Sequence, residues 1–481
     1  MSKLFYILLF LALPLSAQIN VVPQPNEITY HKGTCPISTK ISYIQDKSIN
    51  NPEGYQLIIK PNQIIIKFAT EAGKFYAEQT FNQLVFGAEV THKKSLPCLT
   101  ITDAPRFAYR ALMIDPARHY WKIDDIKKYI DVMAHYKFNY LHLHLTDDQG
   151  WRIEIKKYPK LTEIGSKRSD FEGSKRNNEG FYTQEQIKDL VLYALQRNVQ
   201  LVPEFDVPGH SDAAIAAYPF LSCNDTLIGV RTTAGVSKNL LCVGKEEVFT
   251  FIDDVIAELS AIFPCPYFHI GGDEAPMDKW LEHSPTLKLK QSLHTTNNQQ
   301  LMSEFFKRVN QSLEKNHKRP LIWLELEVPS YPQNSVMYLW RMRTTPQVLE
   351  RAKKDNFKLI CSPGEYAYFD YPQAKNDLPN VDWMPTLTLQ RVYEFNPAFS
   401  LTAKEEKQYI LGVEATLWGE SVKDVFRAFY MTYPRALALS EAGWTEMPKR
   451  DWQQFTQKLD LQLQYLLHKG INYRPPVELH Q

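Results

Sequence analysis

Two neighbouring carboxylates, Asp273 and Glu274, stand in the segment YFHIGGDEAP at residues 267–276, directly after an apolar run and two glycines. Neighbouring carboxylates repel each other, so the pKa of one of them is usually raised. Two carboxylates with separated pKa values favour acid–base chemistry. The alternative is a polar loop that only caps the next helix, and the other motifs of the chain decide between the two interpretations.

Other apolar runs of the chain also end in side chains that suit catalysis or binding. These side chains are Asp115, Arg118, His142, His144, Asp147, Asp148, Asp206, His210, Trp323, Glu325, Trp340, Arg341, Trp418 and Glu420. Helix caps and solvated loops explain one such ending well, but they explain a whole series poorly. We therefore expect these endings to meet in one site.

The elements that would bring these endings together are short apolar runs that alternate with helical stretches. Eight runs cover residues 109–115, 138–148, 199–206, 267–274, 320–325, 335–341, 357–363 and 410–420. Amphipathic stretches between them include residues 124–137, 183–198, 246–263 and 301–316. The alternation predicts an α/β fold, a (β/α)8 TIM barrel, whose strands all end at the rim that carries the active site. A doubly wound open sheet is the alternative, but no GxGxxG follows the first run.

Sequence patterns divide the chain into four parts. Residues 1–17 have a positive start, an apolar stretch and a small-residue end, which is the layout of a signal peptide and is too short for a membrane span. Residues 18–105 predict a small α+β domain. The barrel would occupy residues 106–450, and residues 451–481 would form a closing helix and a tail. We therefore expect an exported protein, periplasmic or extracellular, without a stable membrane span.

Charge and cysteine content narrow the classes of partner. The chain carries 55 basic and 54 acidic residues, a formal net charge of +1, which gives no electrostatic footprint for nucleic acid. Its six cysteines form no CxxC pair and no zinc spacing with histidine. Cys223 and Cys242 bracket a polar loop that a disulfide would close in an exported chain. The other four are expected to be small buried hydrophobic residues.

Carboxylates, histidines, an arginine and tryptophans on one rim suit glycoside hydrolysis. The chain has neither a GxSxG nucleophile motif nor a GK[ST] phosphate loop. An ordinary retaining glycosidase holds two carboxylates about 5 Å apart on opposite sides of the scissile bond. Adjacent residues point apart, so Asp273 and Glu274 cannot be that pair. One of them is expected to reach the leaving group while the other has a different task.

The segment FHIGGDEAP resembles the catalytic signature of glycoside hydrolase family 20, the β-N-acetylhexosaminidases, here of the exported bacterial type. Further matches are RALMIDPARHYW, PEFDVPGHSDAAIAAYPFLSC, YAYFDY and ATLWGE, and the resemblance covers residues 20–450. Ala111 and Leu143 depart from the family pattern, where Gly and Trp are frequent, but neither removes a catalytic group. The resemblance implies an exo-acting, retaining enzyme that removes terminal β-linked GlcNAc or GalNAc from glycans and needs no cofactor.

The same resemblance implies a role for each site residue. The substrate's own acetamide would be the nucleophile, Glu274 the general acid and base, and Asp273 the group that orients the acetamide. Substrate-binding residues would be Arg118, Tyr368, Asp370, Trp323, Trp340, Trp418 and Glu420, and supporting residues would be Asp147, His144, Asp206 and His210. Core packing is the alternative role for each tryptophan. No metal is expected, because His142, His144 and Asp147 would not all face inward from one strand.

Two other functions compete with this one. A lacto-N-biosidase-like enzyme of the same family would release a disaccharide and would need a wider pocket. A glycan-binding protein without activity would have lost catalytic groups, whereas Asp273, Glu274 and Tyr368 are all present.

Overall fold

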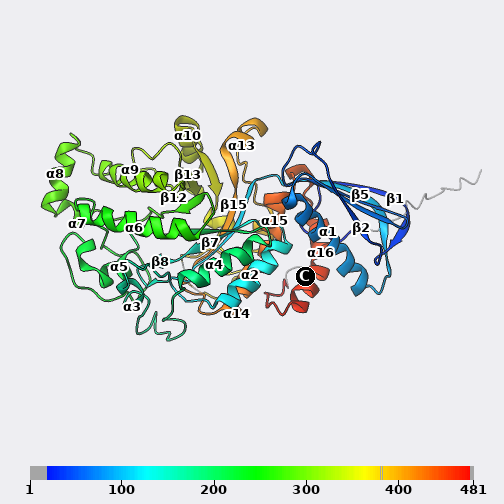
Figure 1. Ribbon diagram of the computed structural model, residues 1–481, viewed down its shortest axis with the longest axis horizontal. Helices are drawn as coiled ribbons and strands as arrows, with labels where there is room; N and C mark the ends of the chain where they lie inside the picture. Colours follow the sequence, from blue (N-terminus) through cyan, green and yellow to red (C-terminus); the bar gives the residue numbers. More distant parts are fainter. Residues whose placement is uncertain (1–18, 380, 382, 477–481) are drawn as a thin grey trace, which may run out of the picture. The chain divides into compact units, whose positions relative to one another are not determined.

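The computed structural model describes residues 19–379, 381 and 383–476, so the predicted signal peptide at residues 1–17 lies outside the described residues. The chain forms two compact units (Figure 1), one of Pro25–Ala104 with residues 19–21 and one of Val22–Gln24 with the chain from Pro105 onward. Residues 22–24 therefore join the second unit, not the domain that their position in the sequence predicts. These residues contact the second unit directly, since the Gln24 N–H donates a hydrogen bond to Glu441 Oε1 at 3.2 Å.

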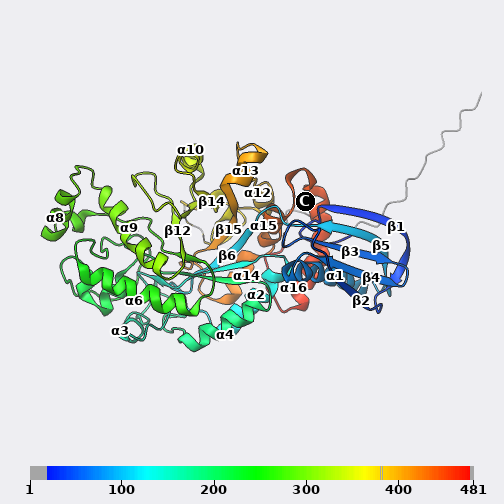
Figure 2. The same cartoon turned by 45° about the horizontal axis from the view of Figure 1, so that its top comes forward.

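The smaller unit is a five-stranded sheet with one helix. Its strands lie side by side in the order β1-β5-β3-β4-β2 (Figure 2), with β1 Glu27–Pro36, β2 Ile41–Gln45, β3 Tyr55–Lys60, β4 Gln63–Phe68 and β5 Ser95–Asp103. Neighbouring strands are antiparallel except for β2 and β4. Helix α1, Glu71–Val90, begins where the Thr70 side chain accepts a hydrogen bond from the Ala72 N–H, and it packs on β3 and β4. The predicted small α+β domain is confirmed.

The larger unit contains a closed barrel of parallel strands. In ring order these are β6 Tyr109–Ile114, β7 Tyr140–His144, β10 Gln200–Glu204, β11 Tyr267–His269, β12 Arg319–Trp323, β13 Val336–Leu339, β14 Lys358–Cys361 and β15 Ile410–Leu417. Every residue of β6 and β13 is buried, which is why barrel strands read as continuous apolar runs. Pairing of β15 with β6 closes the ring and excludes an open sheet. The predicted (β/α)8 barrel is confirmed.

Helices cover the outside of the barrel (Figure 1). The longer ones are α2 Ile123–His135, α4 Gln184–Leu195, α6 Glu246–Ile262, α8 Ser284–Ser292, α9 Gln300–Lys315, α10 Thr345–Asp355, α14 Val425–Thr432, α15 Arg435–Trp444 and α16 Trp452–His468. Shorter elements are α3 Lys160–Glu163, α5 Asp212–Ala217, α7 Asp278–Leu281, α11 Gly364–Ala367, α12 Leu389–Tyr393, α13 Ala403–Tyr409 and a hairpin of β8 Thr146–Asp147 and β9 Gly150–Trp151. In the described part of the chain, no helix combines the length and apolarity that a bilayer crossing requires.

One connection departs from strict alternation. Residues 324–335, between β12 and β13, contain no helix. Pro329 and Pro332 lie in this segment, and proline removes a backbone donor and clashes with the preceding helical turn. The chain therefore passes from the top of one strand to the bottom of the next as an irregular segment.

Cys223 and Cys242 form a disulfide with their Cα atoms 4.9 Å apart, as the sequence predicts. The remaining four cysteines are free and buried, again as expected: Cys35, Cys98, Cys265 and Cys361. The loop that the disulfide closes is tied to the segment after β10, because the Leu241 N–H donates to the Pro208 carbonyl at 2.9 Å.

Candidate active site

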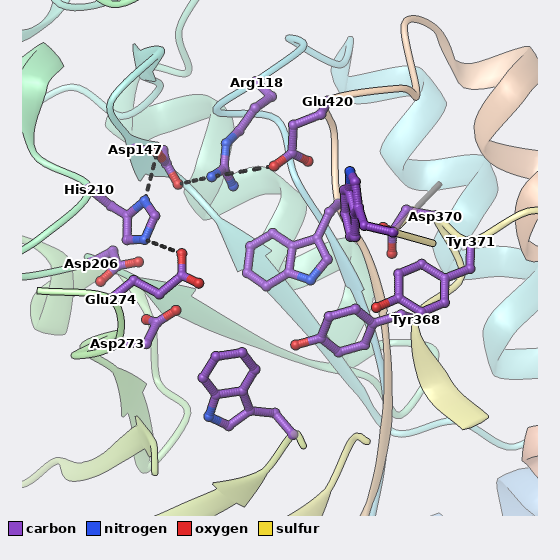
Figure 3. Close-up of a pocket in the computed structure, with 13 residues that line it drawn as sticks. Arg118, Asp147, Asp206, His210, Asp273, Glu274, Tyr368, Asp370, Tyr371 and Glu420 are labelled. Carbon is purple, nitrogen blue, oxygen red and sulfur yellow. Dashed lines mark hydrogen bonds and ion pairs between the residues drawn. The ribbon is translucent and has the colours of Figure 1, made fainter. Parts of the chain in front are cut away.

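A cavity of about 220 Å³ lies at the C-terminal ends of the barrel strands (Figure 3). Segments that follow several different strands supply its lining, which consists of Arg118, Asp147, Asp206, His210, Asp273, Glu274, Trp340, Tyr368, Asp370, Tyr371, Trp383, Trp418 and Glu420. All of these except Tyr371 and Trp383 are residues that the sequence predicts for the site. The barrel thus brings residues from distant parts of the chain to one rim.

The turn after β11 explains the two glycines before the acids. Gly271 and Gly272 have φ values of 62° and 96°, in the left-handed region that favours glycine. A Cβ on Gly271 would stand 1.6 Å from Asp206 Oδ1, so no other residue fits there. Glu274 also has a positive φ, of 48°, which is uncommon for a residue with a side chain. The turn therefore fixes the positions of Asp273 and Glu274 at the cavity.

The two acids have different surroundings. The Glu274 side chain is 37% exposed, whereas Asp273 is 8% exposed. Burial raises the pKa of Asp273 to about 7; the neighbouring His210 opposes this rise and Glu274 reinforces it. Asp273 Oδ1 is buried without a hydrogen-bond partner among the described residues. A donor that enters the cavity would satisfy this oxygen, while Glu274 is open to protonate a ligand.

Alternating charges lead from Glu274 across the cavity (Figure 3). His210 Nε2 lies 3.7 Å from Glu274 Oε2, and His210 Nδ1 lies 3.2 Å from Asp147 Oδ1. Arg118 Nη2 lies 2.8 Å from Asp147 Oδ2 and 3.7 Å from Glu420 Oε1. Burial would raise the pKa of Asp147, but the charges of Arg118 and His210 outweigh it and hold that pKa below its ordinary value. Asp147 is therefore an ionised carboxylate that links the arginine to the histidine.

At two other carboxyl groups of the cavity, burial prevails and the net pKa is raised. It raises the pKa of Asp206 well above its ordinary value, with a further rise from Asp273. It also raises the pKa of Asp370, to which the charge of Glu420 adds. Asp370 Oδ1 is buried and unpaired among the described atoms. Carboxyl groups of this kind can exchange hydrogen bonds with hydroxyl groups, which both donate and accept.

Aromatic rings form the apolar part of the cavity. Trp340, Trp418 and Tyr368 line it as predicted, and Tyr371 and Trp383 extend the wall. The ring centres of Tyr368 and Tyr371 are 5.6 Å apart, and those of Tyr371 and Trp383 are 6.1 Å apart. Neither Tyr371 nor Trp383 was predicted from the sequence; Trp383 lies in an irregular segment without periodicity and is 69% exposed. The one sequence feature that could have indicated them is their aromatic character, in the segment after the predicted Asp370.

Two of the residues to which the resemblance gives a role, Trp323 and His144, lie beneath the cavity and do not line it. Other strand-end residues expected in the site are also absent from the lining: Asp115, His142, Asp148, Glu325 and Arg341. Trp323, expected in the wall, is 1% exposed, because its indole N–H turns into the barrel and donates to Glu204 Oε1 at 3.1 Å. Its ring instead lies near that of Trp418, with centres 5.8 Å apart. His144 is fully buried between Asp147 and Glu204. Its place suits a supporting role and excludes direct contact with a ligand in the cavity.

Several histidines and carboxylates under the cavity come within reach of a single ion, among them His144, Asp147 and Asp206. In this group of three, Asp147 already faces Arg118 and His144, and Asp206 Oδ1 accepts from the Gly272 N–H at 3.2 Å. We therefore assign no metal or cofactor to these residues. Independence from metal stays a prediction.

The arrangement suits the binding and cleavage of a sugar. Aromatic faces can pack on the apolar faces of a ring, a guanidinium and buried carboxyl groups can bind its hydroxyls, and an exposed acid beside a buried acceptor can work on the scissile bond. The chemistry is that of a glycoside hydrolase.

Comparisons with known proteins place the chain in a family. The model of glycosyl hydrolase family 20, catalytic domain, matches residues 107–447, and the model of domain 2 of that family matches residues 39–104. A β-hexosaminidase of Akkermansia muciniphila is 38% identical over 461 residues, which cover 95% of this chain and 92% of that protein.

Solved structures agree with the family models. A crystal structure of a β-N-acetylhexosaminidase has a TM-score of 0.89 at 37% identity and covers 94% of this chain and 96% of that one. An exo β-N-acetylglucosaminidase from Vibrio harveyi in complex with N-acetylglucosamine has a TM-score of 0.84 at 30% identity, covering 95% of this chain and 78% of that one. The chain therefore belongs to glycosyl hydrolase family 20 and is a glycoside hydrolase.

Proposed function

We propose that the chain is an exo-acting β-N-acetylhexosaminidase, which removes terminal non-reducing β-linked GlcNAc or GalNAc from glycans with retention of configuration. The observation that carries this proposal is the pair Asp273 and Glu274 at one cavity, the first buried with an unpaired oxygen and the second exposed. The names of relatives support the same activity, since they are β-hexosaminidases and β-N-acetylhexosaminidases.

In the first proposed step, the acetamide oxygen of the bound sugar attacks the anomeric carbon while the glycosidic bond breaks. Glu274 gives its proton to the departing oxygen. Asp273 accepts a hydrogen bond from the acetamide N–H, and Tyr368 donates to the acetamide oxygen. As positive charge develops on the cyclised intermediate, it favours the ionised form of Asp273, whose pKa of about 7 lies close to neutrality in the free enzyme.

In the second step, water attacks the same carbon and the bond to the acetamide oxygen breaks. Glu274 takes one proton from this water and is ready for the next cycle. His210 Nε2, 3.7 Å from Glu274 Oε2, positions the Glu274 side chain in both steps. Two inversions at one carbon give overall retention.

The other cavity residues hold the sugar in this proposal. Arg118 binds the 3- and 4-hydroxyls, Asp370 and Glu420 bind outer hydroxyls, and Trp340 and Trp418 cover the ring and the acetamide. The cavity of about 220 Å³ is smaller than the roughly 300–1,000 Å³ usual for drug-sized ligands. That size supports release of a single sugar and gives no support to a lacto-N-biosidase-like enzyme.

We further propose that the protein is exported to the periplasm or the extracellular space. The positive, apolar and small-residue order of residues 1–17 supports export. The disulfide of Cys223 and Cys242 supports it as well, because disulfides persist mainly in oxidising compartments.

Hydrolysis of three chromogenic substrates tests the activity. We expect release of 4-nitrophenol from the β-GlcNAc and β-GalNAc glycosides and none from the β-lacto-N-bioside. Release of the intact disaccharide would favour the lacto-N-biosidase alternative. Absence of all hydrolysis by folded protein would favour a glycan-binding protein and refute the proposed activity.

A further inference from the structure

A column of buried carboxylates and imidazoles lies beneath the cavity and takes no direct part in the proposed reaction. Its members lie inside the barrel with 0% exposure: His142, His144, Glu204, His269 and Glu414. They come from β7, β10, β11 and β15. Charges buried in this way are costly unless each is paired. The hydrogen-bond and ion-pair partners of each group therefore indicate the role of the column.

Glu204 is the centre of the column. Its Oε1 accepts the Trp323 N–H and lies 2.8 Å from His269 Nδ1. Its Oε2 makes a short contact with His144 Nδ1 and lies 3.1 Å from His142 Nε2. Burial would raise the pKa of Glu204, but the surrounding histidines outweigh it and hold that pKa well below its ordinary value. Glu204 is therefore an ionised carboxylate at the barrel axis.

His144 stands between two carboxylates, while Arg118 Nη1 lies 3.4 Å from its Nε2 and the charge of Asp115 also acts on the ring. Its Nε2 lies 2.7 Å from Asp147 Oδ2, and its Nδ1 contacts Glu204 Oε2. An ionised carboxylate only accepts hydrogen bonds, so each ring nitrogen that faces one needs a proton. Burial would lower the pKa of His144, but the charge of Glu204 and the hydrogen bond to Asp147 raise it well above its ordinary value. His144 is therefore an imidazolium.

Asp147 connects this imidazolium to both sides of the active site. Its Oδ2 accepts from Arg118 Nη2 at 2.8 Å as well as from His144, and its Oδ1 faces His210 Nδ1 at 3.2 Å. His210 faces Glu274 with its other nitrogen. The Asp147 carboxylate thus orients both the Arg118 guanidinium, which is proposed to bind sugar hydroxyls, and the His210 imidazole beside the proposed acid.

We infer that Glu204 is a positioning residue, whose negative charge keeps both protons on His144 so that this imidazolium holds Asp147 in place. The inference rests on the proposed function, since one of its readouts is hydrolysis. Without the charge of Glu204, the pKa of His144 would fall, because burial disfavours the charged ring and Glu204 supplies the largest opposing effect. A neutral ring carries a single proton, so as the pH rises Asp147 would lose the assured hydrogen bond from His144 and keep only Arg118 and His210 as charged partners.

The pH profile of kcat/KM on 4-nitrophenyl β-GlcNAc tests the inference with Glu204→Gln, which removes the charge and keeps the shape. We expect the loss relative to wild type to grow from pH 5 to pH 8, by about tenfold for each pH unit above the lowered pKa. A merely structural role would lower activity by the same factor at every pH. That parallel profile would overturn the inference.

Glu414→Gln is the matched control. Glu414 is a glutamate of the same buried column, but it faces His142 Nδ1, at 2.9 Å, on the side away from Glu204. We expect this variant to keep the shape of the wild-type pH profile, whatever its stability. A shift equal to that of Glu204→Gln would contradict a specific role for Glu204.

A second measurement does not depend on activity or on the folding of Glu204→Gln. In wild-type protein labelled with ¹⁵N-histidine, the signal lost in His144→Gln identifies His144. We expect both of its ring nitrogens to be protonated at pH 8, and a neutral ring at pH 8 would overturn the inference. Failure of the proposed function would be seen separately, as folded wild-type protein that hydrolyses no substrate while the NMR result stands.

Discussion

Asp273 and Glu274 are neighbours in the chain, yet their surroundings differ. Asp273 is buried beside Asp206 and His210, and burial raises its pKa to about 7. Glu274 is open to the cavity, with His210 at 3.7 Å. At the scale of single residues, adjacency is therefore no obstacle to a shared reaction: in the proposed mechanism, Asp273 works from beneath the sugar and Glu274 from its leaving-group side.

Glu274→Gln should lower kcat/KM on a GlcNAc disaccharide by about 10²–10⁴-fold, the usual contribution of a general acid. A 2,4-dinitrophenyl glycoside, whose leaving group needs no proton, should show a much smaller loss in the first step. The side chain is 37% exposed, so the unfolding temperature should stay near that of wild type. Equal losses on both substrates would contradict the acid role.

Asp273 should make stability depend on pH. Its pKa is raised to about 7 in the folded enzyme, against about 3.9 for an unfolded aspartate. Between these values the folded state holds a proton that the unfolded state has lost, so the free energy of unfolding falls as the pH rises from about 4 to about 7.

Asp273→Asn stays uncharged at every pH and should lack this dependence. From pH 5 to pH 8, urea unfolding of wild type should lose on the order of 1–3 kcal/mol relative to the variant. Asp460→Asn, at an exposed position of α16, serves as the control. Parallel curves for wild type and Asp273→Asn would show that burial does not hold the proton on Asp273.

At the scale of elements, some features of the barrel could be predicted from the sequence and others could not. The strands were predictable, because parallel strands buried on both faces are continuous apolar runs. The direction of the Trp323 side chain could not be predicted, because it depends on the register of β12 in the closed barrel. That register turns the indole under the cavity. Trp383 was missed because loop residues carry no periodic signal, and the absent helix at residues 324–335 broke the regular alternation.

Gly271→Ala should displace Asp206 and disturb the turn that holds Asp273, since its Cβ would stand 1.6 Å from Asp206 Oδ1. Gly470→Ala is the matched control, because Gly470 has a similar φ of 68° and open space around the position of a Cβ. The control should lose about 1–2 kcal/mol from its left-handed backbone alone. Gly271→Ala should lose more stability in urea unfolding and most of its activity. If Gly271→Ala kept the wild-type kcat/KM, the turn would not be what positions Asp273 and Glu274.

At the scale of the whole molecule, the disulfide-closed loop beside the site and the predicted signal peptide both support the proposal that this barrel hydrolase is exported. The loop reaches the site through Gln149, whose Nε2 donates to the Thr233 carbonyl at 3.0 Å and whose Oε1 accepts from Arg118 Nε at 2.9 Å. Oxidising conditions would thus favour both the closed loop and the orientation of the proposed sugar-binding arginine.

The mature protein should begin near Gln18, because the signal-like order of charged, apolar and small residues ends there. N-terminal sequencing of protein from its native host measures this directly. Peptide mapping without reductant should find Cys223 linked to Cys242 in the same sample. An intact Met1 on the accumulated protein would count against export.

The central claim is that the substrate's acetamide, held by Asp273 and Tyr368, is the nucleophile. Fluorine on the acetyl group withdraws electrons from the carbonyl oxygen and changes its size little. The most direct measurement is therefore kcat/KM on 4-nitrophenyl β-GlcNAc and its N-fluoroacetyl, N-difluoroacetyl and N-trifluoroacetyl analogues. The proposed mechanism predicts a steady fall, by orders of magnitude across the series, whereas equal kcat/KM values for all four substrates would contradict it.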